Sequence, residues 1–290
     1  MPELVTTGLW AAQVQAIRNL EISLAANHAR GVIQMATGSG KTFTATTASH
    51  RLLKFGKAKR ILFLVDRTNL GKQALNEFQQ FVSPYSNYKF TEEYPVQLLR
   101  RNTIDPAAKV CITTIQRLYS ILKGEEEFDE ENEEASLFES APSLVREPMP
   151  VVYNPRVPIE TFDVIIIDEC HRSIYNVWRQ VLEYFDTFLA GLTATLTPQA
   201  VGFFNGNVIQ DYSHEKAVVD GVNVGYDVYR IATKVTQGGA TLAKEPGHLV
   251  PYRDRRTRKR KLKELEDDLT YTAGHLDRDV VAMDQIRLAA

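Results

Sequence analysis

The sequence has 290 residues, of which 44% are hydrophobic and 24% charged, as is typical of a globular protein with one large or two small domains. The formal net charge of −2 combines an acidic run, Glu125 to Glu134, with a basic run, Arg253 to Lys263. No apolar stretch reaches membrane-spanning length and no signal pattern is visible, so we expect a cytoplasmic protein without a membrane partner. Cys111 and Cys170 lie beside β-branched runs, which favours buried thiols in a reducing compartment over a disulfide.

Short β-branched segments alternate with longer segments of helical period. The predicted strands are residues 32–35, 60–65, 110–114, 162–167 and 188–192. The predicted helices are residues 42–55, 70–81, 115–122 and a helix that holds Val177, Trp178, Val181, Leu182 and Phe185 at core-like spacing. This alternation predicts βαβ units, and therefore an α/β fold with a parallel sheet flanked by helices.

Three segments interrupt the pattern. Residues 124–158 are acidic and rich in proline, which indicates an insertion or long loop. Residues 221–235 have glycine punctuation and partial alternation, which predicts a late strand near the edge or end of the domain. Residues 237–268 are polar and highly charged. We therefore predict a nucleotide-binding domain over 1–235 and, over 236–290, a charged linker that could begin a further domain.

The segment QMATGSGKT, from Gln34 to Thr42, follows a predicted strand and precedes a predicted helix. Small residues let backbone N–H groups point at a polyphosphate, whereas the alternative is a glycine turn before an ordinary helix. Lys41 is predicted to reach the β- and γ-phosphates and Thr42 to ligate Mg²⁺. The residues predicted to bind the nucleotide here are Thr37, Gly38, Ser39, Gly40, Lys41 and Thr42.

Two adjacent carboxylates, Asp168 and Glu169, follow the apolar residues 164–167. Ligands bind at the carboxyl ends of strands in open α/β sheets, so Asp168 is predicted to hold Mg²⁺ and Glu169 to polarise the attacking water. The alternative is a surface turn. His171 is a further catalytic candidate because it lies near the acid pair, although a structural histidine is the more common case.

The tripeptide Thr193-Ala194-Thr195 ends the next predicted strand. Its two hydroxyls, on Thr193 and Thr195, could hydrogen-bond Glu169 or His171. We therefore predict that they couple the nucleotide state to the rest of the protein.

Together these stretches resemble the DEAD/DEAH-like superfamily 2 helicases, specifically the R (motor and restriction) subunit of type I restriction enzymes. The resemblance covers nearly the whole chain and is carried by QMATGSGKTFTA, LFLVDRTNLGKQA, TTIQRLYSIL, VVYNP, TFDVIIIDECHRSIYNVWRQVLEYFD, GLTAT and YSHEKAVVDGVNVGYDVYRI. It implies a RecA-like first motor lobe that binds ATP and Mg²⁺ and couples hydrolysis to translocation on double-stranded DNA. It also implies specificity and methyltransferase subunits as partners.

The resemblance assigns further roles to single residues. It implies that Gln13 recognises adenine. It implies nucleic-acid contacts for Asp66, Arg67, Asn69, Thr113, Thr114 and Gln116. The alternative for Asp66, Thr68 and Thr113 is plain N-capping of the helices that follow. Met35 stands where the general phosphate-loop pattern has a glycine, a position that helicase-type loops often relax. Leu196 departs from the family pattern, because it replaces the usual proline after Thr195.

Such R subunits carry a nuclease domain before the motor and a second RecA-like lobe after it, and we expect neither within these residues. Because the missing lobe supplies arginines to the ATP site, we predict that the chain alone binds ATP but hydrolyses it slowly. Two alternatives remain: a stand-alone superfamily 2 helicase or repair translocase, and a nucleotide- and DNA-binding fragment without turnover. The basic run is interpreted as a solvated linker, with a DNA-binding strip as its alternative, and the acidic run is expected to face away from DNA or stay disordered.

Overall fold

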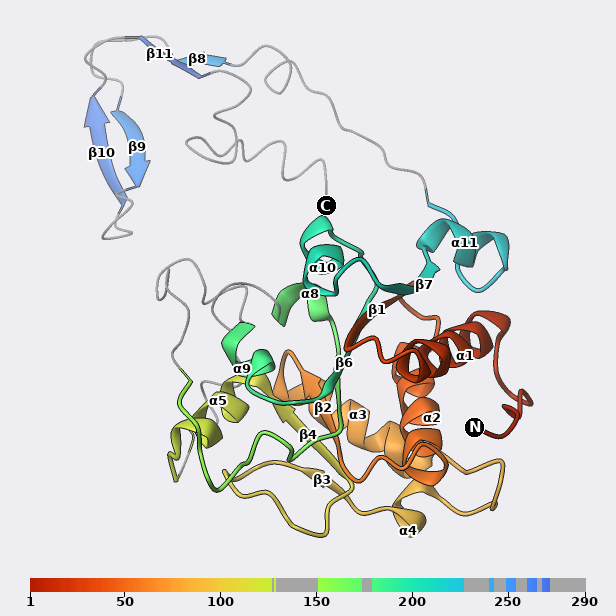
Figure 1. The fold of residues 1–290 in the computed structure, drawn as a ribbon. Helices are drawn as coiled ribbons and strands as arrows, with labels where there is room; N and C mark the ends of the chain where they lie inside the picture. The colour runs from red at the N-terminus through yellow and green to blue at the C-terminus, as the bar shows by residue number, and fades with distance from the viewer. Residues whose placement is uncertain are drawn as a thin grey trace. The chain divides into compact units, whose positions relative to one another are not determined.

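A computed structural model describes residues 1–126, 128, 151–173, 179–226, 240–242, 249–253, 260–264 and 268–271 (Figure 1). The chain divides into two compact units, Met1–Gly225 and Tyr226–Ala290, which are described separately. The predicted strands and helices lie in the first unit, except the predicted late strand over 221–235, which extends past its end.

The first unit is built on a seven-stranded sheet with the order β3-β4-β2-β5-β6-β1-β7. All of its strand pairs are parallel, as predicted. The strands are β1 (Arg30–Met35), β2 (Ile61–Val65), β3 (Val96–Leu98), β4 (Val110–Thr114), β5 (Val164–Ile167), β6 (Phe188–Thr193) and β7 (Val208–Tyr212). The two edge strands, β3 and β7, are the ones that the sequence pattern did not predict.

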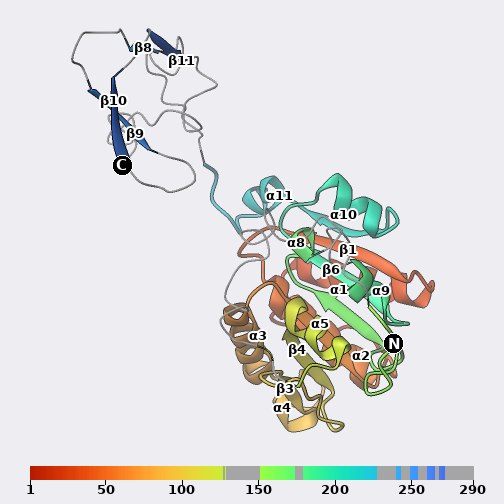
Figure 2. The same cartoon turned by 90° about the vertical axis from the view of Figure 1, so that its left-hand side faces the viewer.

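Helices cover both faces of this sheet (Figures 1 and 2). Their bounds are α1 (Ala11–Ala25), α2 (Lys41–Lys54), α3 (Thr68–Gln80), α4 (Phe90–Glu93), α5 (Ile115–Lys123), α8 (Cys170–Ser173), α9 (Arg179–Glu183), α10 (Pro198–Phe203) and α11 (His214–Val219). One core contains buried residues of α1 to α4 and α11, and a second contains buried residues of α5, α8, α9 and α10. The sheet separates the two cores, which gives three layers.

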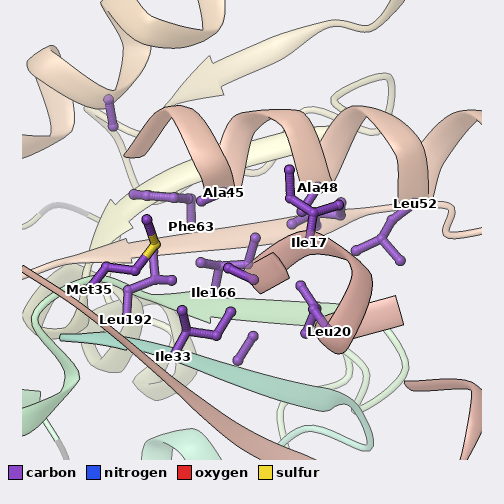
Figure 3. Close-up of a cluster of buried hydrophobic side chains, with 14 of the residues drawn as sticks. Ile17, Leu20, Ile33, Met35, Ala45, Ala48, Leu52, Phe63, Ile166 and Leu192 are labelled. Carbon is purple, nitrogen blue, oxygen red and sulfur yellow. The ribbon is translucent and has the colours of Figure 1, made fainter. Parts of the chain in front are cut away.

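Alternation along the strands explains why both faces are apolar. In β1, Ile33 and Met35 belong to the core under α1 and α2, whereas Val32 belongs to the opposite core. Figure 3 shows Ile33, Met35, Phe63 and Ile166 among the side chains of the first core. Phe63 is fully buried, so its truncation to alanine would cost about 3–5 kcal/mol. A central parallel sheet buried on both faces gives a rigid base for the loops at its edge.

Two sequence predictions need correction or restriction. The predicted late strand over 221–235 is wrong for residues 221–226, which form a turn and irregular backbone, and residues 227–235 lie outside the described part. The edge position is filled by β7 instead. In the predicted helix around Val177 and Trp178, these two residues also lie outside the described part, while Val181 and Leu182 of α9 are buried as expected.

Within the predicted insertion, residues 151–158 carry no helix or strand, and most of the acidic run lies outside the described residues. In the second unit, β8 (Ala240–Leu242) pairs antiparallel with β11 (Leu269–Tyr271), and β9 (Leu249–Arg253) with β10 (Arg260–Glu264). The sequence pattern predicted a charged linker over 236–290 and none of these strands. Among the described helices, none combines the length and apolarity needed to cross a bilayer.

Candidate nucleotide-binding site

The carboxyl ends of β1, β2, β4, β5 and β6 meet at one edge of the sheet because these strands are parallel. This edge is where ligands bind in open α/β folds. The loop after β1 and the acid pair after β5 therefore lie at the same edge, as does the threonine pair at the end of β6.

The backbone of the loop after β1 favours glycine at two positions. Gly38 and Gly40 have positive φ angles of 81° and 78°, which favour glycine. Gly40 also precedes the first residue of α2, and a Cβ atom added to it would lie 2.3 Å from Nε2 of Gln13. The Ser39 hydroxyl donates to the Ala36 carbonyl at 2.6 Å and so tightens the loop. A loop of this kind before a helix N-terminus forms a cradle for phosphate.

Gln13 contacts this loop from α1. Its Nε2 donates to the Ser39 carbonyl at 3.1 Å, and its Oε1 accepts from the backbone N–H of Trp10 at 3.0 Å. The side chain is buried, with 5% of the residue exposed. Only the resemblance singled this residue out, because its polarity and helical context alone are unremarkable.

Lys41 and Glu169 come from different parts of the chain and meet at the sheet edge. The Nζ atom of Lys41 lies 3.8 Å from Oε1 of Glu169 and donates to the Met35 carbonyl at 3.3 Å. The lysine side chain is only 11% exposed. Thr42, in the first turn of α2, is partly buried. A buried ammonium group near a carboxylate suits a site that holds both phosphate and metal.

Asp168 is held at the end of β5, where its backbone N–H donates to the Leu64 carbonyl at 2.8 Å. Burial, followed by the negative charge of Glu169, raises the pKa of Asp168 to about 6. Glu169 itself has a φ angle of 46°, a left-handed conformation that costs a non-glycine residue about 1–2 kcal/mol. A backbone strained at Glu169, beside an Asp168 carboxyl whose ionised form is destabilised by burial, fits a position where a bound cation would compensate the negative charge.

The described residues contain no group of three or more His, Cys, Asp or Glu side chains able to hold a metal by themselves. Mg²⁺ commonly takes one or two protein ligands together with water and phosphate oxygens. The residues present, Thr42 and Asp168, fit this mode of binding.

His171 links Glu169 to the end of β6. Its Nδ1 lies 2.9 Å from Oγ1 of Thr193 and 3.3 Å from Oε2 of Glu169. The Thr193 hydroxyl donates to the Thr195 carbonyl at 2.8 Å, so the histidine is the donor in its contact with Thr193. Burial lowers the pKa of His171. The structure thus brings together the acid pair, His171 and both threonines.

The residues predicted to contact nucleic acid fall into two groups. Arg67 is 38% exposed at its side chain and Asn69 is exposed, whereas Asp66, Thr113 and Thr114 are almost fully buried. Gln116 is also buried.

The capping alternative is wrong for Asp66, Thr68 and Thr113. The N-cap residue of α3 is Arg67, which makes no side-chain cap, and that of α5 is Thr114, which accepts from Arg117 N.

Two contacts at this edge were missed by sequence reasoning. Arg172 NH1 lies 3.2 Å from Oδ2 of Asp66, and Nδ2 of Asn223 donates to the Thr37 carbonyl at 3.1 Å. Arg172 stands within the quoted stretch that contains DECHR, but the sequence pattern indicated no function for it. Asn223 likewise stands within the quoted stretch YSHEKAVVDGVNVGYDVYRI, but its contact depends on strand β7 and helix α11, which were not predicted.

Residues 7–198 match the model of the family described as "Type III restriction enzyme, res subunit". The chain belongs to this family. The chain is 28% identical over 263 residues to the type I restriction enzyme EcoKI endonuclease subunit of Escherichia coli K12, and the match covers 84% of this chain and 20% of that protein. It is 30% identical over 287 residues to the EcoAI endonuclease subunit of E. coli, a match that covers 96% of this chain and 29% of that protein. The chain thus spans less than a third of the length of these relatives.

These relatives confirm the predicted resemblance to the helicase-like domain of the R subunit of type I restriction enzymes. A solved structure of the SWI2/SNF2 ATPase core of Sulfolobus solfataricus, in complex with double-stranded DNA, superimposes with a TM-score of 0.51 at 11% identity. That likeness covers 77% of this chain and 48% of the other. At this level of identity it supports the fold alone, which is the predicted RecA-like first lobe.

Proposed function

We propose that this domain binds ATP·Mg²⁺ and provides one half of the ATPase site of a motor that translocates double-stranded DNA. The observation that carries the proposal is the 3.8 Å separation between Lys41 Nζ and Glu169 Oε1 at the carboxyl edge of the sheet. It joins a glycine-rich phosphate cradle to a pair of strand-end carboxylates. These are the two parts that a nucleotide-hydrolysing site of this type needs.

Each residue has a distinct task in the proposal. Backbone N–H groups of Gly38, Gly40 and Lys41 and the Lys41 ammonium would bind the phosphates, while Thr42 and Asp168 would hold the magnesium ion. When bound, Mg²⁺ supplies charge neutralisation at the β- and γ-phosphate oxygens. Glu169 would polarise the attacking water.

His171, Thr193 and Thr195 would transmit the state of this site to the end of β6. The hydrogen bonds from His171 to Thr193 and from Thr193 to Thr195 support this role. A displacement of Glu169 on hydrolysis would change the Nδ1 contact of His171 first.

The binding part of the proposal is tested by titrating the chain with a fluorescent ATP analogue in the presence of Mg²⁺. We expect saturable binding that unlabelled ATP reverses and that EDTA weakens. Absence of binding would contradict the proposal.

The chain by itself should hydrolyse ATP slowly. An arginine that stabilises the transferring phosphoryl group is worth about 10³–10⁵ in rate. In the described first unit, Arg67, directly after β2, and Arg172, in α8 after β5, are both paired with Asp66. Measuring phosphate release with and without double-stranded DNA tests this, and strong DNA-stimulated turnover by the chain alone would overturn it.

Double-stranded DNA and the specificity and methyltransferase subunits of a restriction complex are the proposed partners, in the cytoplasm. The support is membership of a restriction-enzyme family and similarity to type I endonuclease subunits. Contacts through Arg67, Asn69 and the ends of β2 and β4 would grip the DNA backbone without reading bases. Sequence specificity would then come from another subunit.

A further inference from the structure

The phosphate loop has two outward-facing carbonyl groups that accept hydrogen bonds from carboxamide side chains. Gln13 of α1 donates to the Ser39 carbonyl at 3.1 Å, and Asn223 donates to the Thr37 carbonyl at 3.1 Å. A loop that points its N–H groups at phosphate must point carbonyl groups away from it. The two amides therefore hold the outer side of the loop from opposite ends of the domain's sequence.

The backbone around Asn223 is fixed by a complete helix end. Gly221, with a φ angle of 71°, ends α11, and its N–H donates to the Val218 carbonyl at 3.0 Å. The N–H groups of Val222 and Asn223 both donate to the Ala217 carbonyl, at 2.9 and 3.0 Å. This is the hydrogen-bond pattern of a Schellman C-cap, which leaves little freedom to the residues that follow.

Packing fixes the same segment against the domain. Ala217 is fully buried and Val222 packs against the core under α1 and α2. At the start of the segment, the Tyr212 carbonyl at the end of β7 accepts from Ala36 N at 2.9 Å. Residues 212–223 thus touch the phosphate loop at two points, beside Ala36 and at Thr37.

The Asn223 amide is oriented by a second partner. Its Nδ2 lies 3.2 Å from Nδ1 of His214, which must act as the acceptor because an amide nitrogen only donates. Its Oδ1 would be 3.5 Å from a Cβ atom added to Gly38, so the side chain lies directly against the loop. One amide nitrogen therefore joins the first residue of α11 to the loop.

We propose that Asn223 is a positioning residue for the phosphate loop, and that through it nucleotide binding further stabilises residues 214–225. These are the last residues of the first unit, which ends at Gly225. The inference rests on the proposed ATP site. A ligand that favours one conformation of the phosphate loop also favours the conformation of the segment that holds Asn223, because coupling between two parts of a protein is reciprocal. Nucleotide binding at the loop would then affect residues 214–225, at which the chain leaves the first unit.

The test compares the full chain with Asn223→Ala and Asn223→Asp. Asn223→Asp keeps the shape but places a carboxylate oxygen against the Thr37 carbonyl. Asn19→Ala is the matched control, because Asn19 also donates from Nδ2 to a backbone carbonyl, that of Ile209 at 2.9 Å, away from the loop. Affinity for the non-hydrolysable analogue adenylyl imidodiphosphate with Mg²⁺ is measured, together with hydrogen exchange at saturating analogue.

In the unaltered chain and in Asn19→Ala, we expect the analogue to slow exchange both in the phosphate loop and in residues 214–225. In Asn223→Ala, affinity should fall about three- to tenfold, the loss of one hydrogen bond, and in Asn223→Asp by more. At saturation both Asn223 variants should protect the loop but no longer residues 214–225. A purely structural role would speed exchange in that segment equally with and without analogue.

If the Asn223 variants bind as tightly as the unaltered chain, or keep nucleotide-dependent protection of residues 214–225, the inference is wrong while the ATP site stands. If the unaltered chain does not bind the analogue at all, the proposed function fails, and the inference fails with it.

Discussion

Oδ2 of Asp66 lies 3.2 Å from NH1 of Arg172 and 3.8 Å from Nε of Arg67. Asp66 is 1% exposed, whereas the two arginine side chains are 39% and 38% exposed. A buried carboxylate between two partly exposed guanidinium groups holds them in place, and the three residues together carry one net positive charge. We infer that Asp66 acts by positioning these arginines, which are suited to DNA phosphates, and makes no phosphate contact itself.

Replacing Arg172 by alanine should therefore weaken DNA binding regardless of sequence. Loss of one phosphate contact reduces the slope of log K against log salt concentration by about 1. The measurement is a DNA titration at several salt concentrations, with Arg18→Ala, an exposed arginine of α1, as the control of equal charge. An unchanged slope in Arg172→Ala would show that Arg172 does not touch the DNA backbone.

Replacing Gln13 by alanine should reduce the preference for ATP over GTP. The carboxamide uses one N–H for Ser39 and one lone pair for Trp10, so one donor and one acceptor position remain. These match N7 and the N6 amino group of adenine, whereas guanine presents two acceptors, N7 and O6. Competition titrations with ATP and GTP give the ratio of the two affinities. If both affinities fall by the same factor, Gln13 only holds the loop.

The buried guanidinium of Arg51 predicts a large effect on stability. It is 1% exposed, is bound by Glu21 at 2.5 and 3.0 Å and by the Pro2 carbonyl at 2.7 Å, and also donates to the Tyr85 hydroxyl. Glu21→Ala removes the countercharge and should lower the free energy of unfolding by about 3 kcal/mol in urea titrations.

Glu183→Ala is the control for this change, because it breaks more exposed ion pairs, with Arg30 at 2.9 Å and with Arg179 at 3.0 Å. It should cost less than about 1 kcal/mol. Equal losses in the two variants would mean that burial of the Arg51 charge is unimportant.

Asp168 predicts a dependence of stability on pH. Its pKa in the folded chain is raised to about 6 from an ordinary 3.8, so its contribution to stability is complete below pH 3.8 and is lost as the pH rises through 6. Asp168→Asn cannot ionise. Without nucleotide or Mg²⁺, this variant should therefore be more stable than the unaltered chain at pH 7.5, by about 2 kcal/mol, and not at pH 4.

Thermal unfolding at the two pH values, with the exposed Asp186→Asn as control, measures this difference. If Asp168→Asn is less stable than the unaltered chain at pH 7.5, the Asp168 pKa is not raised in the folded chain. Asp168→Asn should also lose Mg²⁺-dependent nucleotide binding, because the carboxylate that lowers stability is the one that would hold the ion.

The central strands and the helices after them could be predicted because their signals are local. Residues 61–65 and 164–167 are continuous apolar runs, as strands buried on both faces must be, and both form strands at the predicted positions. The edge strands β3 and β7 were not predicted, because an edge strand needs no continuous apolar run. In β7, for example, Val208 and Asp211 are exposed. The late strand predicted over 221–235 is wrong for residues 221–226, which begin with Gly221 directly after the C-cap of α11.

The loop and the acid pair were found in sequence because each is a short motif whose residues must be adjacent. Their partners were not, since hydrogen bonds such as that of Asn223 to Thr37 or Arg172 to Asp66 join residues far apart in the chain. Such contacts follow from the strand order, which no local pattern encodes. His171 and Thr193 were linked correctly only because both were placed at neighbouring strand ends.

The most direct test of the ATP site is the affinity for a fluorescent ATP analogue with Mg²⁺ in Lys41→Ala and Glu169→Gln. Lys109→Ala, at an exposed lysine before β4, serves as the control. Loss of a charged hydrogen-bond donor to phosphate should lower the affinity of Lys41→Ala about tenfold or more, while Glu169→Gln and Lys109→Ala bind like the unaltered chain. Unchanged affinity in Lys41→Ala would contradict the assignment of residues 37–42 as the phosphate-binding loop.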